Sequence, residues 1–270
     1  MQMHLLPKNC WVGKQSIPLK KCVRMLGRQL KINLNNLFEL AKDAANQAGT
    51  FLNNNKNVTK QIITDEGRDI KLELDRNTEE LINKILAKSK IPVMGEELNS
   101  KISSDFFWVV DPIDGTANYF RGLDQCCVSI GLIKNEEAVL GVIYNFNTNE
   151  MFAALKGKGA FLNDKKIEVS KIQNKDQASL TTGFPASESI ESSLEFLEGL
   201  QGWKKIRMFG SAALSCAYVA SGKCDAYIEK GVYLWDFAAG ICLVNEAGGR
   251  AIYSKIDSER YSVKFDNNCL

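Results

Sequence analysis

Histidine is almost absent from this sequence: of 270 residues only His4 is a histidine, and it lies near the amino terminus. The most common general base of enzymes is therefore missing from nearly the whole chain. The eight cysteines include no Cys-x-x-Cys pair, so a zinc site built on cysteine and histidine spacing is not predicted. If the chain is an enzyme, carboxylates and the metal ions that they bind must carry out the chemistry.

Long apolar runs are absent as well. None approaches the ~20 residues that a membrane-spanning helix needs, and the continuous apolar stretch of a secretory signal is missing. We therefore expect no membrane contact, a cytoplasmic location and reduced thiols. An apolar content of 45% over this length is sufficient for a large globular core.

Acidic residues are missing from residues 1–33, which carry seven basic ones. The other 237 residues carry 27 basic and 32 acidic residues, a net charge of −5. Such an acidic body argues against nucleic acid as its main partner. We expect the basic segment to lie outside the fold, either as an arm for targeting or binding, nucleic acid included, or as a leader foreign to the native chain.

Apolar periodicity predicts the first secondary-structure elements. Helical spacing over 34–52 indicates an amphipathic helix, and a second helix is predicted around 81–86 with a capping box at 77–80. The polar residues 53–68 between them are interpreted as a loop or a mobile hairpin. Short apolar runs then predict strands at 91–94, 106–110, 128–133, 138–144 and 151–154.

Hairpin turns are predicted at 145–149 and 163–164, and the Lys-Gly-Lys-Gly run at 156–159 is interpreted as a hairpin connection in preference to a phosphate loop. Further along, strands are predicted at 180–184, 206–209 and 226–229, and helices at 187–200, 212–220 and 236–247. The pattern indicates an α+β protein. Its α+β region, 34–175, would continue into an α/β region, 176–270, to form one catalytic unit.

Three acidic clusters follow or flank predicted strands: Gly95-Glu96-Glu97, the run 111–116, and Trp235-Asp236. Gathering carboxylates in one place is costly unless a cation neutralises them. Oxygen ligands of this kind suit Mg²⁺, Mn²⁺ or Ca²⁺ better than zinc. The clusters therefore predict a site for a hard divalent cation.

The run 111–116, Asp-Pro-Ile-Asp-Gly-Thr, combines features of a metal site and of a phosphate site. Asp111 ends a predicted buried strand, and the proline after it fixes the next turn, so that Asp114 can point to the same side. Gly115 lets the backbone approach a ligand closely, and Thr116 adds a hydroxyl where free backbone N–H groups favour an anion.

This run, together with Trp-Asp-Phe-Ala-Ala-Gly at 235–240 and Glu-Ala-Gly-Gly at 246–249, resembles the signatures of the inositol monophosphatase family. The resemblance extends from about Leu34 to the carboxyl terminus. It implies a layered α-β-α-β-α sugar-phosphatase fold with two sheets between helix layers, usually in a homodimer. It also implies lithium-sensitive, Mg²⁺-dependent hydrolysis of a small phosphorylated polyol, with myo-inositol 1-phosphate as the leading candidate.

The resemblance assigns the metal ligands residue by residue. Glu96, Asp111 and the carbonyl of Ile113 would hold one Mg²⁺, and Asp111, Asp114 and Asp236 would hold a second. A weaker third ion would be shared by Glu96. The implied reaction is a direct in-line attack by water that a metal ion activates, with no covalent phosphoenzyme.

The remaining assignments concern catalysis and the substrate. Asp75 would help to position the attacking water near Thr116, and both would act in catalysis with Glu96. Gly115 and Thr116 would bind the phosphate. Other substrate contacts would come from Gly210, Ser211, Ala212 and Glu229, and from the metal-site residues Glu96, Ile113, Asp114 and Asp236.

Two alternatives remain open. Within the same superfamily, the substrate could be a 3′(2′),5′-bisphosphate nucleotide or another sugar phosphate. Glu229 favours a hydroxyl-rich ring, because a carboxylate accepts hydrogen bonds from hydroxyls and would repel a second phosphate. In a different class, the chain could act as an interaction partner in RNA or transcription complexes.

Overall fold

The computed structural model describes residues 9–12, 15–18, 33–56, 62–66, 69–98, 102–184 and 194–270. Its chain forms two compact units, residues 1–36 and 37–270. In the first unit, strands β1 (Asn9–Val12) and β2 (Gln15–Pro18) pair antiparallel. Most of the basic segment lies outside the described residues, and the boundaries expected at 33 and 175 stay predictions.

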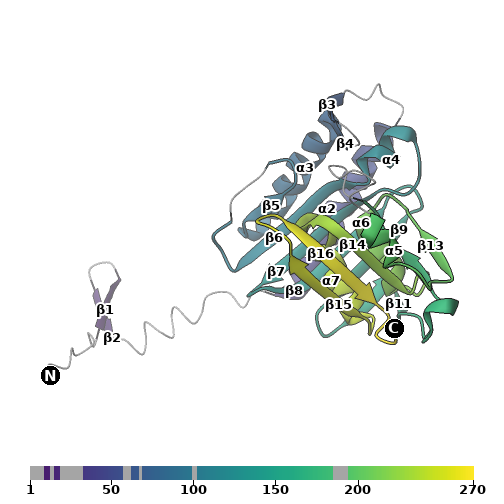
Figure 1. The fold of residues 1–270 in the computed structure, drawn as a ribbon. Helices are drawn as coiled ribbons and strands as arrows, with labels where there is room; N and C mark the ends of the chain where they lie inside the picture. Colours follow the sequence, from purple (N-terminus) through teal and green to yellow (C-terminus); the bar gives the residue numbers. More distant parts are fainter. Residues whose placement is uncertain are drawn as a thin grey trace. The chain divides into compact units, whose positions relative to one another are not determined.

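A seven-stranded sheet of order β11-β10-β9-β8-β7-β6-β5 lies in the second unit (Figure 1). Neighbouring strands run antiparallel, except for β5 and β6, which are parallel. The strands predicted between 91 and 154 are all present. The three predicted hairpin connections join β8 to β9, β9 to β10 and β10 to β11, so these predictions are confirmed. The strands are β5 (Val93–Gly95), β6 (Phe106–Asp114), β7 (Cys127–Lys134), β8 (Glu137–Asn145), β9 (Glu150–Leu155), β10 (Gly159–Leu162) and β11 (Lys165–Ile167).

Helices cover both faces of this sheet, which explains why β7 and β8 are buried along nearly their whole length. On one face Tyr144 packs against Gly49 of α2 (Leu34–Asn54). On the same face the indole of Trp108 donates a 3.0 Å hydrogen bond to Ser89, just after α3 (Glu73–Leu86). No helix of the described residues is long and apolar enough to cross a membrane.

Helix α7 (Leu234–Glu246) packs on the other face. Gly131 and Gly141 pair with each other across β7 and β8 beneath it. A Cβ atom at Gly141 would lie 2.1 Å from the Ala239 carbonyl oxygen, so only glycine permits this approach. The tight packing brings the first turn of α7, which carries Asp236, close to the end of β6.

A second sheet has five strands in the order β13-β12-β14-β16-β15. Strand β12 is parallel to β13 and β14, and the other pairs are antiparallel. The three strands predicted in this region are confirmed, with bounds that differ by up to four residues. The members are β12 (Ser179–Thr181), β13 (Lys205–Arg207), β14 (Ala226–Tyr233), β15 (Arg250–Lys255) and β16 (Arg260–Asp266).

Helices α6 (Ala212–Ala220) and α7 fill the space between the two sheets (Figure 1). Along β14, Tyr227 points into this layer, whereas its neighbour Ala226 packs on the other side, in a cluster with Leu197 of α5 (Leu194–Glu198). The layers are thus α2 and α3, the first sheet, α6 and α7, the second sheet, and α5. This order confirms the predicted α-β-α-β-α fold. Of the helix predicted at 187–200, residues 187–193 lie outside the described residues, and α5 occupies Leu194–Glu198 of the remainder.

A β-hairpin lies between α2 and α3. Residues 53–68 do contain one strand of a hairpin, because β3 (Ile62–Glu66) pairs antiparallel with β4 (Asp69–Leu72). The capping box predicted at 77–80 is wrong, since α3 begins at Glu73. Thr78 and Glu79 are buried in its interior turns. Their polar side chains resemble a cap in the sequence, but Thr78 donates a hydrogen bond to the Leu74 carbonyl within α3, and Glu79 accepts hydrogen bonds from the distant amides of Glu97 and Leu98.

Candidate active site

Strand β6 does not end near Asp111, as predicted, but continues to Asp114. On β7, Asp111 pairs with Ser129 and Asp114 pairs with Cys127, so β6 carries one extra residue between the two pairs. In a regular strand, residues three apart point to opposite faces. The extra residue forms a bulge, which re-aims the chain beyond it and brings both carboxylates to one side.

Asp236, in the first turn of α7, completes a cluster with these two residues. Carboxylate oxygens of Asp111, Asp114 and Asp236 all lie within 4.8 Å of one another. The orientation of Asp236 is fixed by the Tyr233 amide, which donates a 2.7 Å hydrogen bond to its Oδ2 atom. The cluster therefore joins a strand end and a helix start that are more than 100 residues apart in sequence.

The carboxylates of this cluster resist ionisation together. Burial, and after it the charge of Glu96, raises the pKa of Asp111 well above its usual value. Burial and the charge of Asp114 do the same to the pKa of Asp236. The candidate ligand atoms of this cluster are carboxylate oxygens, and their negative charges repel one another. The residues present therefore fit a hard divalent cation such as Mg²⁺.

Asp114 differs from Asp111 in the number of protein donors that hold it. Its Oδ1 accepts a 3.1 Å hydrogen bond from the Ala212 amide, and its Oδ2 accepts one of 2.9 Å from the Ala213 amide. The hydroxyl of Ser211, the N-cap residue of α6, also donates to Oδ2, and the Cys127 thiol lies 3.5 Å from it. The Asp114 carboxylate thus fastens the start of α6 to the end of β6.

Thr116 opens the short helix α4 (Thr116–Arg121), directly after Gly115. Its hydroxyl lies 2.9 Å from the Ile113 carbonyl oxygen and 3.3 Å from Oδ1 of Asp75. Asp75 is buried in the first turn of α3, 41 positions earlier in the chain. The structure therefore brings Asp75 and Thr116 together, although Asp75 lies behind Thr116 and does not line the pocket.

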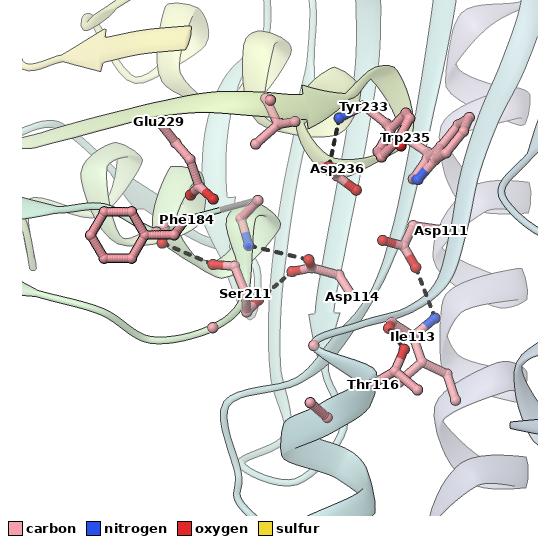
Figure 2. Close-up of a pocket in the computed structure, with 18 of the residues that line it drawn as sticks. Asp111, Ile113, Asp114, Thr116, Phe184, Ser211, Glu229, Tyr233, Trp235 and Asp236 are labelled. Atoms are coloured by element: carbon pink, nitrogen blue, oxygen red, sulfur yellow. Dashed lines mark hydrogen bonds between the residues drawn. The ribbon is translucent and has the colours of Figure 1, made fainter. Parts of the chain in front are cut away.

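A cavity of about 420 Å³ opens over these residues. Figure 2 shows Glu229 and Phe184 at one end of it and Asp111 and Trp235 at the other. With the exception of Asp75, all residues assigned to the site in the sequence line this cavity: Glu96, Asp111, Ile113, Asp114, Gly115, Thr116, Gly210, Ser211, Ala212, Glu229 and Asp236.

Glu229 stands on β14, away from the acidic cluster. Burial raises the pKa of its carboxyl to about 7, although the hydrogen bond of 2.9 Å from the Tyr227 hydroxyl opposes the shift. The side chain is therefore held in a defined orientation, and it can accept hydrogen bonds from a bound ligand.

The cavity also has an aromatic and apolar wall that sequence reasoning missed. Phe184 and Met208 line it, and Tyr233 stacks on Trp235 with ring centroids 4.8 Å apart and planes 5° from parallel. The proximity of Tyr233 and Trp235 to Asp236 in the sequence is a signal that could have revealed them. Phe184 and Met208 have no such signal, because they follow strands of the other sheet.

A five-layered α+β fold with a cluster of carboxylates at one end of its cavity is typical of a class, the layered sugar-phosphate phosphatases. The sequence model of the inositol monophosphatase family matches residues 33–263. The chain therefore belongs to the inositol monophosphatase family, which confirms the predicted resemblance and classes it with phosphoric monoester hydrolases.

Individual relatives agree with this membership. The chain is 38% identical over 234 residues to Nus factor SuhB of Xylella fastidiosa, covering 84% of this chain and 85% of the relative. It is 36% identical over 222 residues to inositol monophosphatase 2 of Saccharomyces cerevisiae, covering 75% of each. The crystal structure of extragenic suppressor protein SuhB from Bartonella henselae superposes with a TM-score of 0.79 at 32% identity, over 87% of this chain and 95% of that one.

Proposed function

We propose that this protein hydrolyses the phosphate monoester of a small polyol in a Mg²⁺-dependent reaction, with myo-inositol 1-phosphate as the leading substrate. The observation that carries the proposal is the arrangement of one cavity. Three carboxylates, of which those of Asp111 and Asp114 are buried, lie within 4.8 Å of one another at one end of it, and the single carboxylate of Glu229 lies at the other (Figure 2). The three clustered carboxylates suit a metal ion, which in turn would bind the phosphate. The Glu229 carboxylate suits the hydroxyls of the substrate.

In this proposal Glu96, Asp111 and the Ile113 carbonyl, which all line the cavity, would hold one Mg²⁺, and Asp111, Asp114 and Asp236 would hold another. A weaker third ion would be shared by Glu96. Bound Mg²⁺ would lower the pKa of the water that acts as nucleophile, and its positive charge would stabilise the negative charge of the phosphate. The raised pKa of Asp111 supports this role, because its causes are burial and the charges of neighbouring carboxylates, which a bound cation would offset.

The protein's own groups orient the reactants. The Thr116 hydroxyl lies within hydrogen-bond distance of Asp75 and of the Ile113 carbonyl and can donate its hydrogen bond to either oxygen. Its oxygen would then be oriented to accept a hydrogen bond from the attacking water. Gly115 and Thr116 would bind the phosphate. The polyol would lie against Gly210, Ser211, Ala212 and Glu229, with the Glu229 carboxylate accepting hydrogen bonds from ring hydroxyls.

Two alternatives are weaker. A 3′(2′),5′-bisphosphate nucleotide or another sugar phosphate would use the same metals, but Glu229 would repel the second phosphate of such a nucleotide. The name of the Xylella relative, Nus factor SuhB, supports a role in transcription complexes. Binding of the full chain to RNA in a salt-dependent manner would favour that role. The homodimer and the cytoplasmic location stay predictions, and size-exclusion chromatography with light scattering tests the former.

The proposed activity is tested by measuring phosphate release with malachite green. Myo-inositol 1-phosphate, a 3′,5′-bisphosphate nucleotide and p-nitrophenyl phosphate are compared in Mg²⁺ and in excess EDTA. We expect the inositol phosphate to have the highest kcat/KM, and EDTA to stop every reaction. Turnover that persists in EDTA would contradict the metal mechanism, whereas a preference for the nucleotide would replace the substrate.

A further inference from the structure

Glu79, on α3, is fully buried and lies outside the cavity. Its Oε2 accepts a 2.8 Å hydrogen bond from the Glu97 amide, and its Oε1 accepts one of 3.1 Å from the Leu98 amide. These two amides follow Glu96 directly in the chain. One carboxylate of a distant helix thus holds the backbone of the turn that carries Glu96.

The residue before Glu96 contacts the same carboxylate. A Cβ atom at Gly95 would lie 2.0 Å from Oε1 of Glu79, so glycine is needed for the carboxylate to fit. The Glu96 amide itself donates a 3.3 Å hydrogen bond to the carbonyl of Val110, the residue before Asp111. The backbone around Glu96 is therefore held on one side by Glu79 and on the other by β6.

A buried carboxylate at this position is costly for folding. Burial raises the pKa of Glu79, and the two amide hydrogen bonds oppose that shift. An apolar side chain would be cheaper to bury, but it would leave the amides of Glu97 and Leu98 without this acceptor. The carboxylate is thus explained by the turn that it holds and not by the packing of α3.

We propose that Glu79 is a positioning residue of the metal site: by holding the turn at 96–98, it sets the Glu96 carboxylate beside Asp111. The inference rests on the proposed function, since Glu96 is there a ligand of the metal. Residues that hold a ligand in place contribute strongly to metal affinity, and their loss typically weakens it about 10- to 100-fold.

The test is isothermal titration calorimetry of Mg²⁺ and Mn²⁺ into the full chain, with melting temperatures recorded for each variant. Glu79→Ala should weaken metal binding about 10- to 100-fold. Glu79→Gln keeps the shape and one acceptor, so it should weaken binding less. Gly95→Ala leaves Glu79 in the chain but displaces its carboxylate, and it should resemble Glu79→Ala. Glu80→Ala is the matched control, because Glu80 is the next residue of α3 and its side chain is 54% exposed.

Kinetics separate positioning from chemistry. The Mg²⁺ concentration for half-maximal activity should rise in Glu79→Ala in proportion to the loss of affinity, while kcat at saturating Mg²⁺ recovers most of its value. Folded Glu79→Ala and Gly95→Ala variants that bind metal like the wild type would overturn the inference, even if their melting temperatures fell. If Glu79→Ala does not fold, Glu79→Gln and Gly95→Ala decide by the same criterion. A wild-type chain that binds neither metal would instead contradict the proposed function.

Discussion

The amide of Ala213 donates a 2.9 Å hydrogen bond to Oδ2 of Asp114, although 99 positions separate the two residues. The same carboxylate accepts hydrogen bonds from the Ser211 hydroxyl and the Ala212 amide. The start of α6 is therefore anchored on a residue of the acidic cluster. Asp114 therefore stabilises the fold as well as the site. Asp111 instead accepts a local hydrogen bond of 3.0 Å, from the amide of Ile113 two positions along the chain.

This difference predicts that Asp114→Asn destabilises the protein. The asparagine side chain would place an NH₂ group against an N–H or O–H donor, so at least one charge-assisted hydrogen bond is lost. Each such bond contributes about 1.5–3 kcal/mol. Urea unfolding in EDTA should show a decrease in the free energy of unfolding of about this size. Unchanged stability would mean that α6 does not depend on Asp114.

Asp111→Asn should leave the metal-free fold intact and abolish turnover. The pKa of Asp111 is raised by burial and by neighbouring carboxylates, so removing its charge relieves repulsion in the absence of metal. In EDTA the melting temperature should equal or exceed that of the wild type, and added Mg²⁺ should no longer raise it. Asp236→Asn should behave alike. Near-wild-type phosphatase activity of either variant at saturating Mg²⁺ would contradict the two-metal assignment.

The metal-free protein should lose stability as the pH rises. The pKa of Glu229 is raised in the folded state from its ordinary 4.5 to about 7. A raised folded-state pKa gives a stabilising contribution that is full below pH 4.5 and is lost as the pH rises through about 7. The contribution is on the order of 3 kcal/mol. Thermal melts in EDTA from pH 4.5 to 8 check this.

Glu229→Gln should reduce the pH dependence without removing it, because the raised pKa values of Asp111 and Asp236 act in the same direction. Glu80→Gln serves as the control, since that side chain is 54% exposed. A Glu229→Gln variant with the wild-type slope would show that folding does not raise the pKa of Glu229.

Glu229→Ala should lower kcat/KM for one substrate and not for another. A hydrogen bond to a charged group is worth about 1.5–3 kcal/mol, so its loss should lower kcat/KM for myo-inositol 1-phosphate by about ten- to a hundred-fold. p-Nitrophenyl phosphate has no ring hydroxyls, and its hydrolysis should be spared. An equal loss for both substrates would make Glu229 a structural or electrostatic residue, and no loss for either would remove it from the site.

Millimolar Li⁺ should inhibit phosphate release in the presence of Mg²⁺. The expectation follows from membership of the inositol monophosphatase family and from the resemblance in the sequence, not from the spacing of the carboxylates. Inhibition curves at several Mg²⁺ concentrations, with Na⁺ as the control, measure it. Mg²⁺-dependent activity that is indifferent to Li⁺ would place the chain apart from the lithium-sensitive members of the superfamily.

Much of the fold could be predicted from local pattern. The strands from 91 to 154 are apolar runs between turn residues, and the turn at 163–164 places both residues at positive φ, as asparagine and aspartate tolerate. The hairpin of β15 and β16 was not predicted, because the residues of β15 are nearly all exposed and lack an alternating apolar pattern. The predicted start of α3 was wrong, because polar residues in its first turns have partners far away in the chain, as Asp75 has in Thr116.

The sequence by itself determined the metal end of the site. Asp111 and Asp114 stand within one short run, and Asp236 lies in a second run, and such gathered carboxylates favour a cation-binding site. Only the tertiary structure decided what surrounds them: Asp75 behind Thr116, Phe184 and Met208 in the wall, and Glu79 beneath the turn of Glu96. Contacts between separate layers of a fold join residues whose spacing along the chain is arbitrary, so they leave no periodic trace in the sequence.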